Sequence, residues 1–399
     1  FMISVVSAAL LLPAMAAAGE WLQFRGPGGL GVSDATNMPV SWSEDTNLVW
    51  KRALPGYGAS SPIVLGERIY LTCYSGYGID RQNPGDIDDL MRHLVCVDRG
   101  SGKILWDKSV KAALPEDPYS GMGVPSHGYA SHTPVSDGEN VYVFFGKSGA
   151  FAFDKDGNQL WQRSVGSQSD DKRWGSSSSP ILHDDLLIVT ASAESRALVG
   201  LNKKTGEEVW RQETDGLTDV WGTPLLVNVE DRTDLVIGVP YEFWGLNPAT
   251  GKLRWYSEAM NTDSYNSSVV ESDGVIYGIE GRGGGSAAVK AGGKGDVTES
   301  HTVWSGNDSA RFGTPLVVDG RVYYFSNGVA NCISAEDGSS IFKGRLPSTS
   351  SRGAGNREGD GNRRGGGGQP GDRPQGGGRG GFGGGFGGGR GGFGGGRGR

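Results

Sequence analysis

Aromatic, histidine and arginine side chains recur in this sequence just ahead of short segments that begin with Ser or Thr and lead into apolar strands. These residues are Tyr57, His127, Tyr129, His132, Trp174, Trp221, Tyr265 and Arg311. If they converge, they could bind a small molecule or a peptide, because ligand sites combine aromatic walls with a few polar groups. The alternative is that they only fill a central space between repeated elements. Whether these residues form a ligand site or only fill the centre depends on how the strands that carry them are arranged.

Metal and thiol chemistry have little support. His127 and His132 could form a pair of metal ligands, but no third ligand accompanies them, and zinc sites use at least three protein ligands. The chain has three Cys, with no adjacent pair and no C-x-x-C motif. Aligning the repeats described below places Tyr70 opposite Cys96 and turns Cys73 to the other face of the sheet, which predicts buried free thiols.

The sequence contains six copies of one unit. Each copy begins with Ser or Thr, usually before Pro, and runs through a short apolar strand, a tight turn and a Val- and Tyr-rich strand to a closing aromatic residue. That residue ends a Gly-x-x-x-aromatic motif in five copies, whereas the fifth copy is degenerate and has a Gly-rich insertion before Trp304. The copies begin at Ser61, Thr133, Ser179, Thr223, Ser268 and Thr314 and close at Trp106, Trp161, Trp210, Trp255, Trp304 and Phe342. Alternating Val, Ile and Tyr predict half-buried strands, and Asp-Gly pairs supply the positive φ of hairpin turns.

Four short strands per unit cannot bury both of their faces alone, so neighbouring units must stack. A radial stack predicts an all-β fold, a β-propeller of four-stranded blades, with six blades visible and seven or eight in the intact protein. One Trp per blade on the outermost strand is predicted to fill the wedge between blades, since a ligand does not need one Trp from each blade. This docking set is Trp50, Trp106, Trp161, Trp210, Trp255 and Trp304.

The first Trp of that set belongs to a stretch, Leu48–Arg52, that reads as an outermost strand with no inner strands before it. Propellers commonly close their ring by completing the last blade with an N-terminal strand. The expected partner strands would follow Pro347, where only Gly-rich sequence is found. We therefore expect a gap in the ring built from residues 48–347 and a chain that is a fragment of a longer protein.

The closing motifs resemble those of a known family. Asp98-x-x-Ser101-Gly102-x-x-x-Trp106, Asn202-x-x-Thr205-Gly206-x-x-x-Trp210 and Asn247-x-x-Thr250-Gly251-x-x-x-Trp255 are similar to the repeats of pyrroloquinoline-quinone-type (quinoprotein-like) propellers. The resemblance covers residues 48–347. The opening Trp21-Leu22-Gln23-Phe24-Arg25-Gly26-Pro27 is similar to the start of many secreted bacterial proteins of this kind.

The resemblance implies two functions. Dehydrogenases of the family stack the quinone (PQQ) on a Trp, place Ca²⁺ on acidic and amide side chains, use an Asp as base, and many carry an adjacent Cys pair. This chain is shorter and has neither adjacent Cys nor an evident acidic pair at the ring centre. We therefore expect no cofactor and a non-catalytic scaffold that binds a protein partner or small ligand at the channel mouth. It would be similar to the propeller subunit of the outer-membrane protein assembly machinery. A PQQ- and calcium-dependent alcohol or sugar dehydrogenase is the alternative.

The N-terminus reads as a targeting signal. Residues 1–18 contain an apolar stretch followed by Ala16 and Ala18 in an A-x-A cleavage pattern, which predicts a signal peptide and a periplasmic or secreted bacterial protein. Residues 19–47 form an N-terminal extension before the propeller. No apolar run reaches the roughly 18 residues that a transmembrane helix needs.

Residues 348–399 are rich in Gly and Arg and are expected to be disordered. The segment looks like an RGG box, so RNA binding through this tail is a third candidate function. In an exported protein, we favour a flexible basic segment that touches anionic envelope surfaces. The whole chain carries a net charge of −7 despite this basic tail, so the propeller itself is not predicted to bind nucleic acid.

Overall fold

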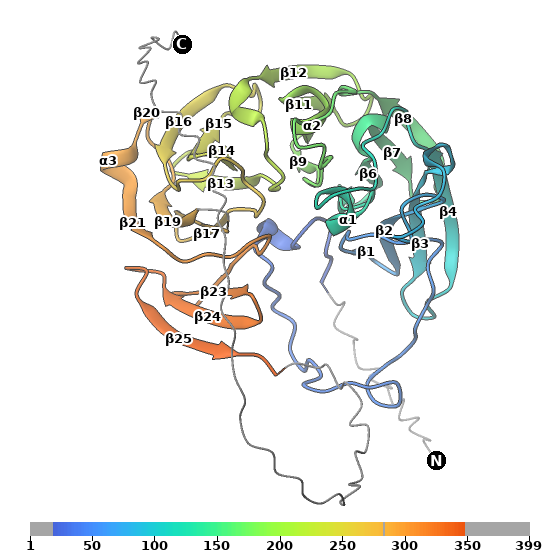
Figure 1. Ribbon diagram of the computed structural model, residues 1–399, viewed down its shortest axis with the longest axis horizontal. Helices are drawn as coiled ribbons and strands as arrows, with labels where there is room; N and C mark the ends of the chain where they lie inside the picture. The colour runs from blue at the N-terminus through green and yellow to red at the C-terminus, as the bar shows by residue number, and fades with distance from the viewer. Residues whose placement is uncertain (1–18, 282–283, 348–399) are drawn as a thin grey trace, which may run out of the picture. The chain divides into compact units, whose positions relative to one another are not determined.

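The computed structural model describes residues 19–281 and 284–347; the predicted signal peptide and the Gly/Arg-rich segment lie outside these ranges. The described chain forms six antiparallel sheets that follow one another along the sequence. Figure 1 shows these sheets arranged around a centre, with the first strand of each nearest to it and the fourth strand at the rim. The predicted all-β propeller of four-stranded blades is confirmed.

Each blade is built from four consecutive repeat strands. Blade 1 comprises β1 (Ile63–Leu65), β2 (Arg68–Ser75), β3 (Met91–Asp98) and β4 (Ile104–Lys111), and blade 2 comprises β5 (Val135–Ser136), β6 (Asn140–Phe144), β7 (Ala150–Asp154) and β8 (Gln159–Arg163). Blade 3 comprises β9 (Ile181–His183), β10 (Leu186–Ala191), β11 (Ala197–Asn202) and β12 (Glu208–Glu213), and blade 4 comprises β13 (Leu225–Val229), β14 (Arg232–Val239), β15 (Glu242–Leu246) and β16 (Leu253–Glu258). Blade 5 comprises β17 (Val270–Ser272), β18 (Val275–Glu280), β19 (Gly285–Lys290) and β21 (Thr302–Gly306), and blade 6 comprises β22 (Leu316–Val318), β23 (Arg321–Ser326), β24 (Val329–Ser334) and β25 (Ser340–Arg345).

The remaining elements are short. The described residues contain three α-helical turns, α1 (Val124–His127), α2 (Ser192–Ser195) and α3 (Thr298–His301), and four 3₁₀ turns, η1 (Pro27–Gly29), η2 (Ile87–Asp89), η3 (Gly146–Ser148) and η4 (Asp215–Leu217). Strand β20 (Gly295–Asp296) adds to the rim of blade 4 in parallel with β16. Within the described ranges, no helix is long and apolar enough to span a membrane.

The recurring Trp side chains at the rim contact the following blade. Trp161 on β8 donates from Nε1 to the backbone oxygen of Lys203 in blade 3 at 2.9 Å, and its ring lies against Gly206, where a Cβ would come within 2.7 Å. Trp106, Trp210 and Trp304 make the same two contacts with the following blade. The Gly of Gly-x-x-x-Trp is therefore needed twice, for the positive φ of its own turn and for the neighbour's ring.

Two members of the docking set differ from the others. Trp255 is fully buried and donates to the side-chain oxygen Oδ2 of Asp234 at 2.7 Å, with β20 paired alongside it. Trp50 takes the docking position on blade 1, where Nε1 donates to Arg99 O at 2.8 Å and the ring lies over Gly102. Among the described residues, no strand pairs with Leu48–Arg52, so Trp50 alone of the docking set stands outside a sheet.

Hydrophobic cores lie between adjacent blades rather than within one sheet. Phe144 of blade 2 packs with Leu187 and Val199 of blade 3, and equivalent clusters join the other consecutive blades. On the far side of blade 6, Phe325 and Phe342 are 58% and 46% exposed, because no blade in the described ranges packs against them. Blades 1 and 6 thus each have one face without a neighbouring sheet, as expected from the unpaired Leu48–Arg52.

The cysteines follow the register predicted from the repeats. Tyr70 pairs with Cys96, and Cys73 pairs with His93 three positions further along the same ladder. Because this offset is odd, the thiols of Cys73 and Cys96 face opposite sides of the sheet. Cys73 and Cys96 pack into different hydrophobic cores, and all three cysteines are buried and free. The prediction of buried free thiols is confirmed.

A relay of hydrogen bonds links the innermost positions of the six blades. The backbone N–H of each starting residue donates to the hydroxyl oxygen of the starting residue in the next blade, at 2.9 to 3.0 Å. The five bonds run from Ser61 to Thr133, Ser179, Thr223, Ser268 and Thr314 in turn. Because these amides are buried or half-buried at the crowded centre, the hydroxyl of the next blade satisfies a donor that would otherwise be unpaired.

Removing one hydroxyl from this relay should destabilise the fold. We expect Thr223→Val to lower the free energy of unfolding by about 1–3 kcal/mol, because the shape is kept while the Ser179 N–H loses its acceptor. Urea unfolding measures the change. Thr250→Val, at an exposed turn position, is the matched control and should change stability by less than about 0.5 kcal/mol. Equal effects for the two variants would contradict the relay.

The N-terminal extension crosses the centre of the ring and links blades 1, 2 and 6. Trp21 pairs with Val64 of blade 1, and the backbone oxygen of Leu22 accepts from Ser136 N of blade 2 at 2.8 Å. Arg25 reaches the opposite side and donates from Nη2 to Pro315 O of blade 6 at 2.8 Å. Figure 1 shows η1 of this segment near the centre of the blades. We call residues 21–31 the plug.

Candidate functional site

A cavity of about 290 Å³ opens where the six blades meet. Its lining residues come from the plug, from the start of every blade and from the turn α1. They are Phe24, Ala59, Met122, Gly123, Ser126, His127, Ser131, Trp174, Ser177, Ser179, Trp221, Thr223, Asn266, Ser268, Phe312 and Thr314. We call it the axial cavity. The plug residue Phe24 belongs to its wall, so the centre of the propeller is not an open pore.

The lining follows a simple period in the sequence. The residue two positions before each blade start lines the cavity in all six blades: Ala59, Ser131, Ser177, Trp221, Asn266 and Phe312. The starting residues themselves line it in four blades, namely Ser179, Thr223, Ser268 and Thr314. Alternate residues of an extended chain point to the same side, so this spacing of two places both sets on the axis.

The aromatic part of the wall is built around two indoles. The rings of Trp174 and Trp221 lie 5.3 Å apart with their planes at 37°, and Trp221 Nε1 donates to Gly175 O at 2.7 Å. Lys172 holds its ammonium 5.7 Å from the Trp221 ring and pairs with Asp219 at 2.6 Å. The cation–π contact of Lys172, held by its ion pair with Asp219, therefore helps to fix the position of the indoles.

His127 is the ionisable residue of the lining. Its Nε2 lies 2.8 Å from Trp174 O and its Nδ1 lies 2.8 Å from Ser131 Oγ, so Nε2 carries the proton and Nδ1 accepts from the Ser131 hydroxyl. Burial lowers the pKa of His127, although the bond to Trp174 O opposes this shift. The axial cavity therefore presents an uncharged imidazole near neutral pH.

A second, polar cavity of about 20 Å³ shares His127 and Trp174 with the first. We call it the inner polar cavity; it has room for about one water molecule. His132 is buried against Phe144, and burial, with Arg92 and His127 nearby, lowers its pKa to about 3. Burial raises the pKa of Glu194 to about 7, although the hydrogen bond that Ser176 Oγ donates to it at 2.5 Å acts in the opposite direction.

Two buried ion pairs complete the inner polar cavity. Arg92 donates to Glu116 at 2.7 Å, and the ammonium of Lys147 lies 3.6 Å from Asp117. All four side chains are no more than 6% exposed. Buried pairs of this kind are costly to desolvate and hold their geometry through further hydrogen bonds, here from Lys147 to Pro115 O and Ser169 Oγ. The cluster joins residues of blades 1 to 3 beside the axial cavity, with which it shares His127 and Trp174.

The structure divides the eight residues expected at the channel mouth into three groups. His127, Trp174 and Trp221 line the axial cavity, and Tyr129 and His132 line the inner polar cavity together with His127 and Trp174. Three residues line neither cavity. Tyr57 is 62% exposed and pairs with Tyr74, Tyr265 is buried against Phe243, and Arg311 is exposed and stacks on Phe312.

Register explains two of these three placements. Trp221 and Phe312 stand two positions before their blade starts and line the axial cavity, whereas Tyr265 and Arg311 stand three positions before theirs. An odd offset turns a side chain to the other side of the extended chain. The period of two could have found Phe312 and Asn266 from the sequence. The wall residues Phe24 and Met122 belong to the plug and a loop, so that period does not reach them.

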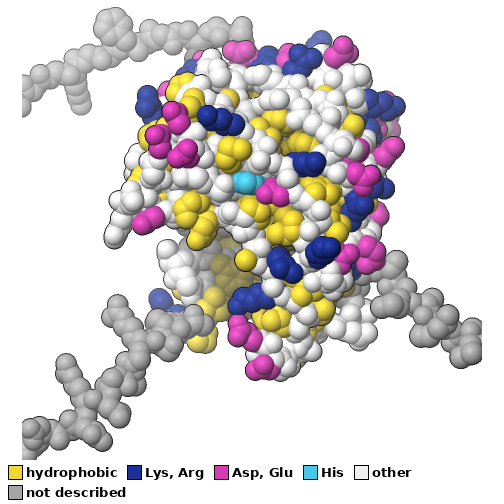
Figure 2. Space-filling model, turned by 90° about the vertical axis from the view of Figure 1, so that its right-hand side faces the viewer, with side chains coloured by type: hydrophobic (Ala, Val, Ile, Leu, Met, Phe, Trp, Pro, Cys, Tyr) yellow, Lys and Arg dark blue, Asp and Glu magenta, His cyan; other side chains and the backbone are white. Residues whose placement is uncertain are grey.

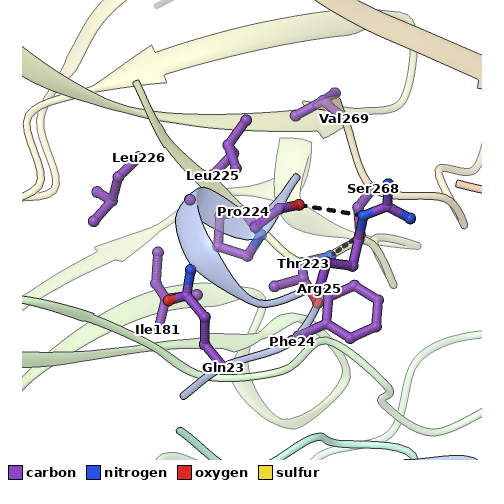
Figure 3. Close-up of a pocket in the computed structure, with 12 residues that line it drawn as sticks. Gln23, Phe24, Arg25, Ile181, Thr223, Pro224, Leu225, Leu226, Ser268 and Val269 are labelled. Carbon is purple, nitrogen blue, oxygen red and sulfur yellow. Dashed lines mark hydrogen bonds between the residues drawn. The ribbon is translucent and has the colours of Figure 1, made fainter. Parts of the chain in front are cut away.

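The plug also forms a small cavity of about 100 Å³ against blades 3 to 5. Figure 3 shows Gln23, Phe24 and Arg25 of the plug among the lining residues, which include Pro224 and Ser268. Burial lowers the pKa of Arg25 to about 10, which still leaves it charged at neutral pH. Its bonds to Gly29 O, Leu30 O and Pro315 O hold the plug in place.

A hydrogen-bonded chain of Ser75, His93 and Asp107 crosses blade 1. Ser75 Oγ lies 2.8 Å from His93 Nε2, and His93 Nδ1 lies 2.9 Å from Asp107 Oδ1. This is the order of groups in a serine hydrolase triad. None of the three residues lines the axial or inner polar cavity, and His93 is only 7% exposed. We assign it the structural role of joining β2, β3 and β4.

The outer surface carries charges of both signs. Figure 2 shows the side of the molecule that carries β4, where Lys and Arg side chains are interspersed with Asp and Glu over much of the face. Nucleic-acid-binding proteins usually gather basic side chains into a patch or stripe. On this face, the charges do not form one.

The blades, the Trp docking and the Asp/Asn-x-x-Ser/Thr-Gly turns define a quinoprotein-type β-propeller. A sequence profile described as outer membrane protein assembly factor BamB matches residues 90–344. The chain belongs to this family. A comparison with curated protein sequences finds no match.

Solved structures share the fold at low sequence identity. BamB from Moraxella catarrhalis is 15% identical, with a TM-score of 0.45 over 73% of this chain and 86% of that one. A europium-containing methanol dehydrogenase is 12% identical, with a TM-score of 0.50 over 82% of this chain and 86% of that one. A quinohemoprotein alcohol dehydrogenase from Comamonas testosteroni is 10% identical, with a TM-score of 0.45 over 83% and 74%. The methanol dehydrogenase likeness shows the fold alone.

Proposed function

We propose that this protein is an exported, non-catalytic β-propeller scaffold that binds a partner or ligand at the axial cavity. The observation that supports this function is the lining itself, in which aromatic rings and hydroxyl groups from blades 2 to 6 converge on one opening beside Ala59 of blade 1. Met122 and Phe312 at this opening are 58% and 51% exposed, which gives a partner apolar anchors. Membership of the assembly-factor family supports a binding role in the bacterial envelope.

The residues of the axial cavity do not fit a bound quinone with calcium. PQQ carries carboxylates, which need cationic partners when they leave water, yet the lining contains no Lys or Arg. Calcium takes six to eight oxygen ligands, largely from carboxylates and carbonyls. In residues 19–281 and 284–347, no three His, Cys, Asp or Glu side chains stand close enough to hold a metal. We therefore derive no reaction step through either group.

Export and the third candidate function depend on residues outside the described ranges. The signal peptide predicted at residues 1–18 supports a periplasmic or secreted location as part of this proposal. RNA binding, or contact with anionic envelope surfaces, would belong to residues 348–399. The proposal for the propeller uses neither segment.

Incubation of the purified full chain with PQQ and Ca²⁺ tests the proposal. We expect no quinone retained after gel filtration and no dye reduction with alcohols or sugars. In parallel, a photo-crosslinking residue at Met122 should form discrete adducts in the source bacterium, whereas the same residue at exposed Ile341 on blade 6 should not. Stoichiometric quinone binding with substrate oxidation would overturn the scaffold function.

A further inference from the structure

The hydroxyl relay leaves a donor unused at four positions of the axial cavity. Ser179, Thr223, Ser268 and Thr314 each accept a backbone N–H from the preceding blade through the side-chain oxygen. A hydroxyl also donates one hydrogen bond. In the described part of the chain, none of the four hydroxyls donates to a protein acceptor. Four O–H groups from adjacent blades are therefore available to a molecule in the cavity that they line.

One acceptor accompanies these donors. The backbone N–H and the side-chain Nδ2 of Asn266 both bind Glu280, at 2.6 and 3.3 Å, which fixes the orientation of its amide. Its Oδ1 accepts no hydrogen bond from the described residues. The cavity thus offers several hydroxyl donors and an amide acceptor, a mixture that suits a ligand whose own groups both donate and accept.

The lining is also uncharged. Its sixteen residues include no Lys, Arg, Asp or Glu. His127, the ionisable member, uses both ring nitrogens within the protein, on Trp174 O and Ser131 Oγ. A charged ligand would lose its hydration here without gaining an ion pair, which costs several kcal/mol or more. The chemistry of the wall therefore selects against both anions and cations.

The apolar part of the lining consists mainly of flat rings. Trp174, Trp221, Phe24 and Phe312 line the cavity, and Lys172 and Asp219 hold the two indoles from behind. Aromatic rings present broad apolar faces that bury a ligand's C–H surface. The volume of about 290 Å³ lies at the lower end of the range for small-molecule sites, about 300–1,000 Å³. The occupant must be small.

We propose that the axial cavity binds a neutral monosaccharide. A pyranose has an apolar C–H face for the rings and hydroxyls that pair with the four O–H groups and with Asn266, and it carries no charge. This inference rests on the proposed function, because it names the ligand class of the same binding site. The protein's hydroxyl relay serves both tasks: its acceptor side holds the blades together and its donor side faces the sugar.

Binding can be measured by isothermal titration and Trp fluorescence on the full chain. The probes are D-glucose and D-galactose, D-glucuronate, D-glucosamine, and cyclohexylmethanol as an apolar ring with one hydroxyl. We expect saturable binding of at least one neutral sugar and at least tenfold weaker binding of the charged sugars and the cyclohexane. Equal affinity for all probes, or no saturable binding of either neutral sugar, would overturn the proposal.

A matched pair of variants locates the site. Phe312→Ala removes a ring from the rim of the cavity and should weaken sugar binding at least fivefold. Phe325→Ala removes an equally exposed ring of blade 6 that does not line the cavity and should leave binding unchanged. Similar affinities for both variants would contradict a sugar in the axial cavity. Denaturation midpoints of the two variants exclude unfolding as the cause of a loss.

Failure of this inference can be separated from failure of the proposed function. Crosslinking of a protein at Met122 without sugar binding would overturn the monosaccharide site and leave the scaffold in place. Quinone-dependent oxidation of a bound neutral sugar would overturn the non-catalytic scaffold and support the sugar site.

Discussion

Trp210→Ala is expected to lower the free energy of unfolding by about 3–5 kcal/mol, the usual cost of deleting a large buried aromatic ring. The Trp210 side chain belongs to the core between blades 3 and 4 with Leu198 and Leu246. Its Nε1 donates to Pro248 O at 3.1 Å, a bond that the truncation also removes. Urea unfolding at neutral pH, followed by circular dichroism, measures the loss.

The control is a Trp of the same chain that docks on nothing. Trp42 is 73% exposed in the N-terminal extension, and Trp42→Ala should change stability by less than about 0.5 kcal/mol. Gly251→Ala gives a second test, because its Cβ would lie 2.4 Å from the Trp210 ring at a φ of +70°. In the double variant the clash is relieved, so the two losses should not add. Additive losses, or a small effect of Trp210→Ala, would contradict blade docking.

The repeat made the fold predictable from the sequence. Each blade repeats the same order of four strands and turns, and five of the six end in Gly-x-x-x-aromatic, so the pattern can be recognised even where one copy departs from it. The predicted pairing of Tyr70 with Cys96 is confirmed even though residues 76–90 interrupt the hairpin. The reason is physical: β2 and β3 continue in register from Arg68 to Ser75, and the insertion lies beyond the end of that ladder.

The site was less predictable, because it depends on single-residue offsets and on a segment outside the repeat. Tyr265 and Trp221 are both aromatic residues just ahead of a blade start, yet one is in the core and the other lines the axial cavity. The starting Ser and Thr mark the beginning of each copy in the sequence, but their hydrogen-bonding relay becomes visible only when the neighbouring blade is in place. The plug reaches blades 1, 2 and 6 through contacts that no local pattern encodes.

The buried His132 of the inner polar cavity is expected to make the free energy of unfolding decrease as the pH falls. Burial lowers the pKa of His132 from its ordinary value of 6.5 to about 3, and the unfolded chain keeps the ordinary value. Between these two values, the unfolded state binds a proton that the folded state does not, so stability falls as the pH falls. The loss of stability from this residue is about 3 kcal/mol by pH ~4.5 and about 4 kcal/mol by pH ~3, and it approaches about 5 kcal/mol below that pH.

His132→Phe should remove this dependence while keeping an aromatic ring against Phe144. The variant loses the contact of Nε2 with Ser176 Oγ at 3.2 Å, so it is expected to be less stable than the wild type at neutral pH. Its disadvantage should shrink by about 3 kcal/mol as the pH is lowered from about 7 to 4.5, since Phe cannot bind a proton. Urea unfolding of both proteins across this range measures the difference.

The pH-dependent changes in stability that come from other ionisable groups are common to both proteins, so they cancel when the two are compared. The exception is Glu194, which shares the Ser176 hydroxyl with His132. His183→Phe, at a histidine on β9 that lines neither cavity, should retain the wild-type acid loss. If the difference between wild type and His132→Phe stays constant within about 0.5 kcal/mol across the range, the folded protein accepts a proton at His132. The inner polar cavity would then hold a charged imidazole beside Arg92, and the uncharged environment deduced for the neighbouring axial cavity would need revision.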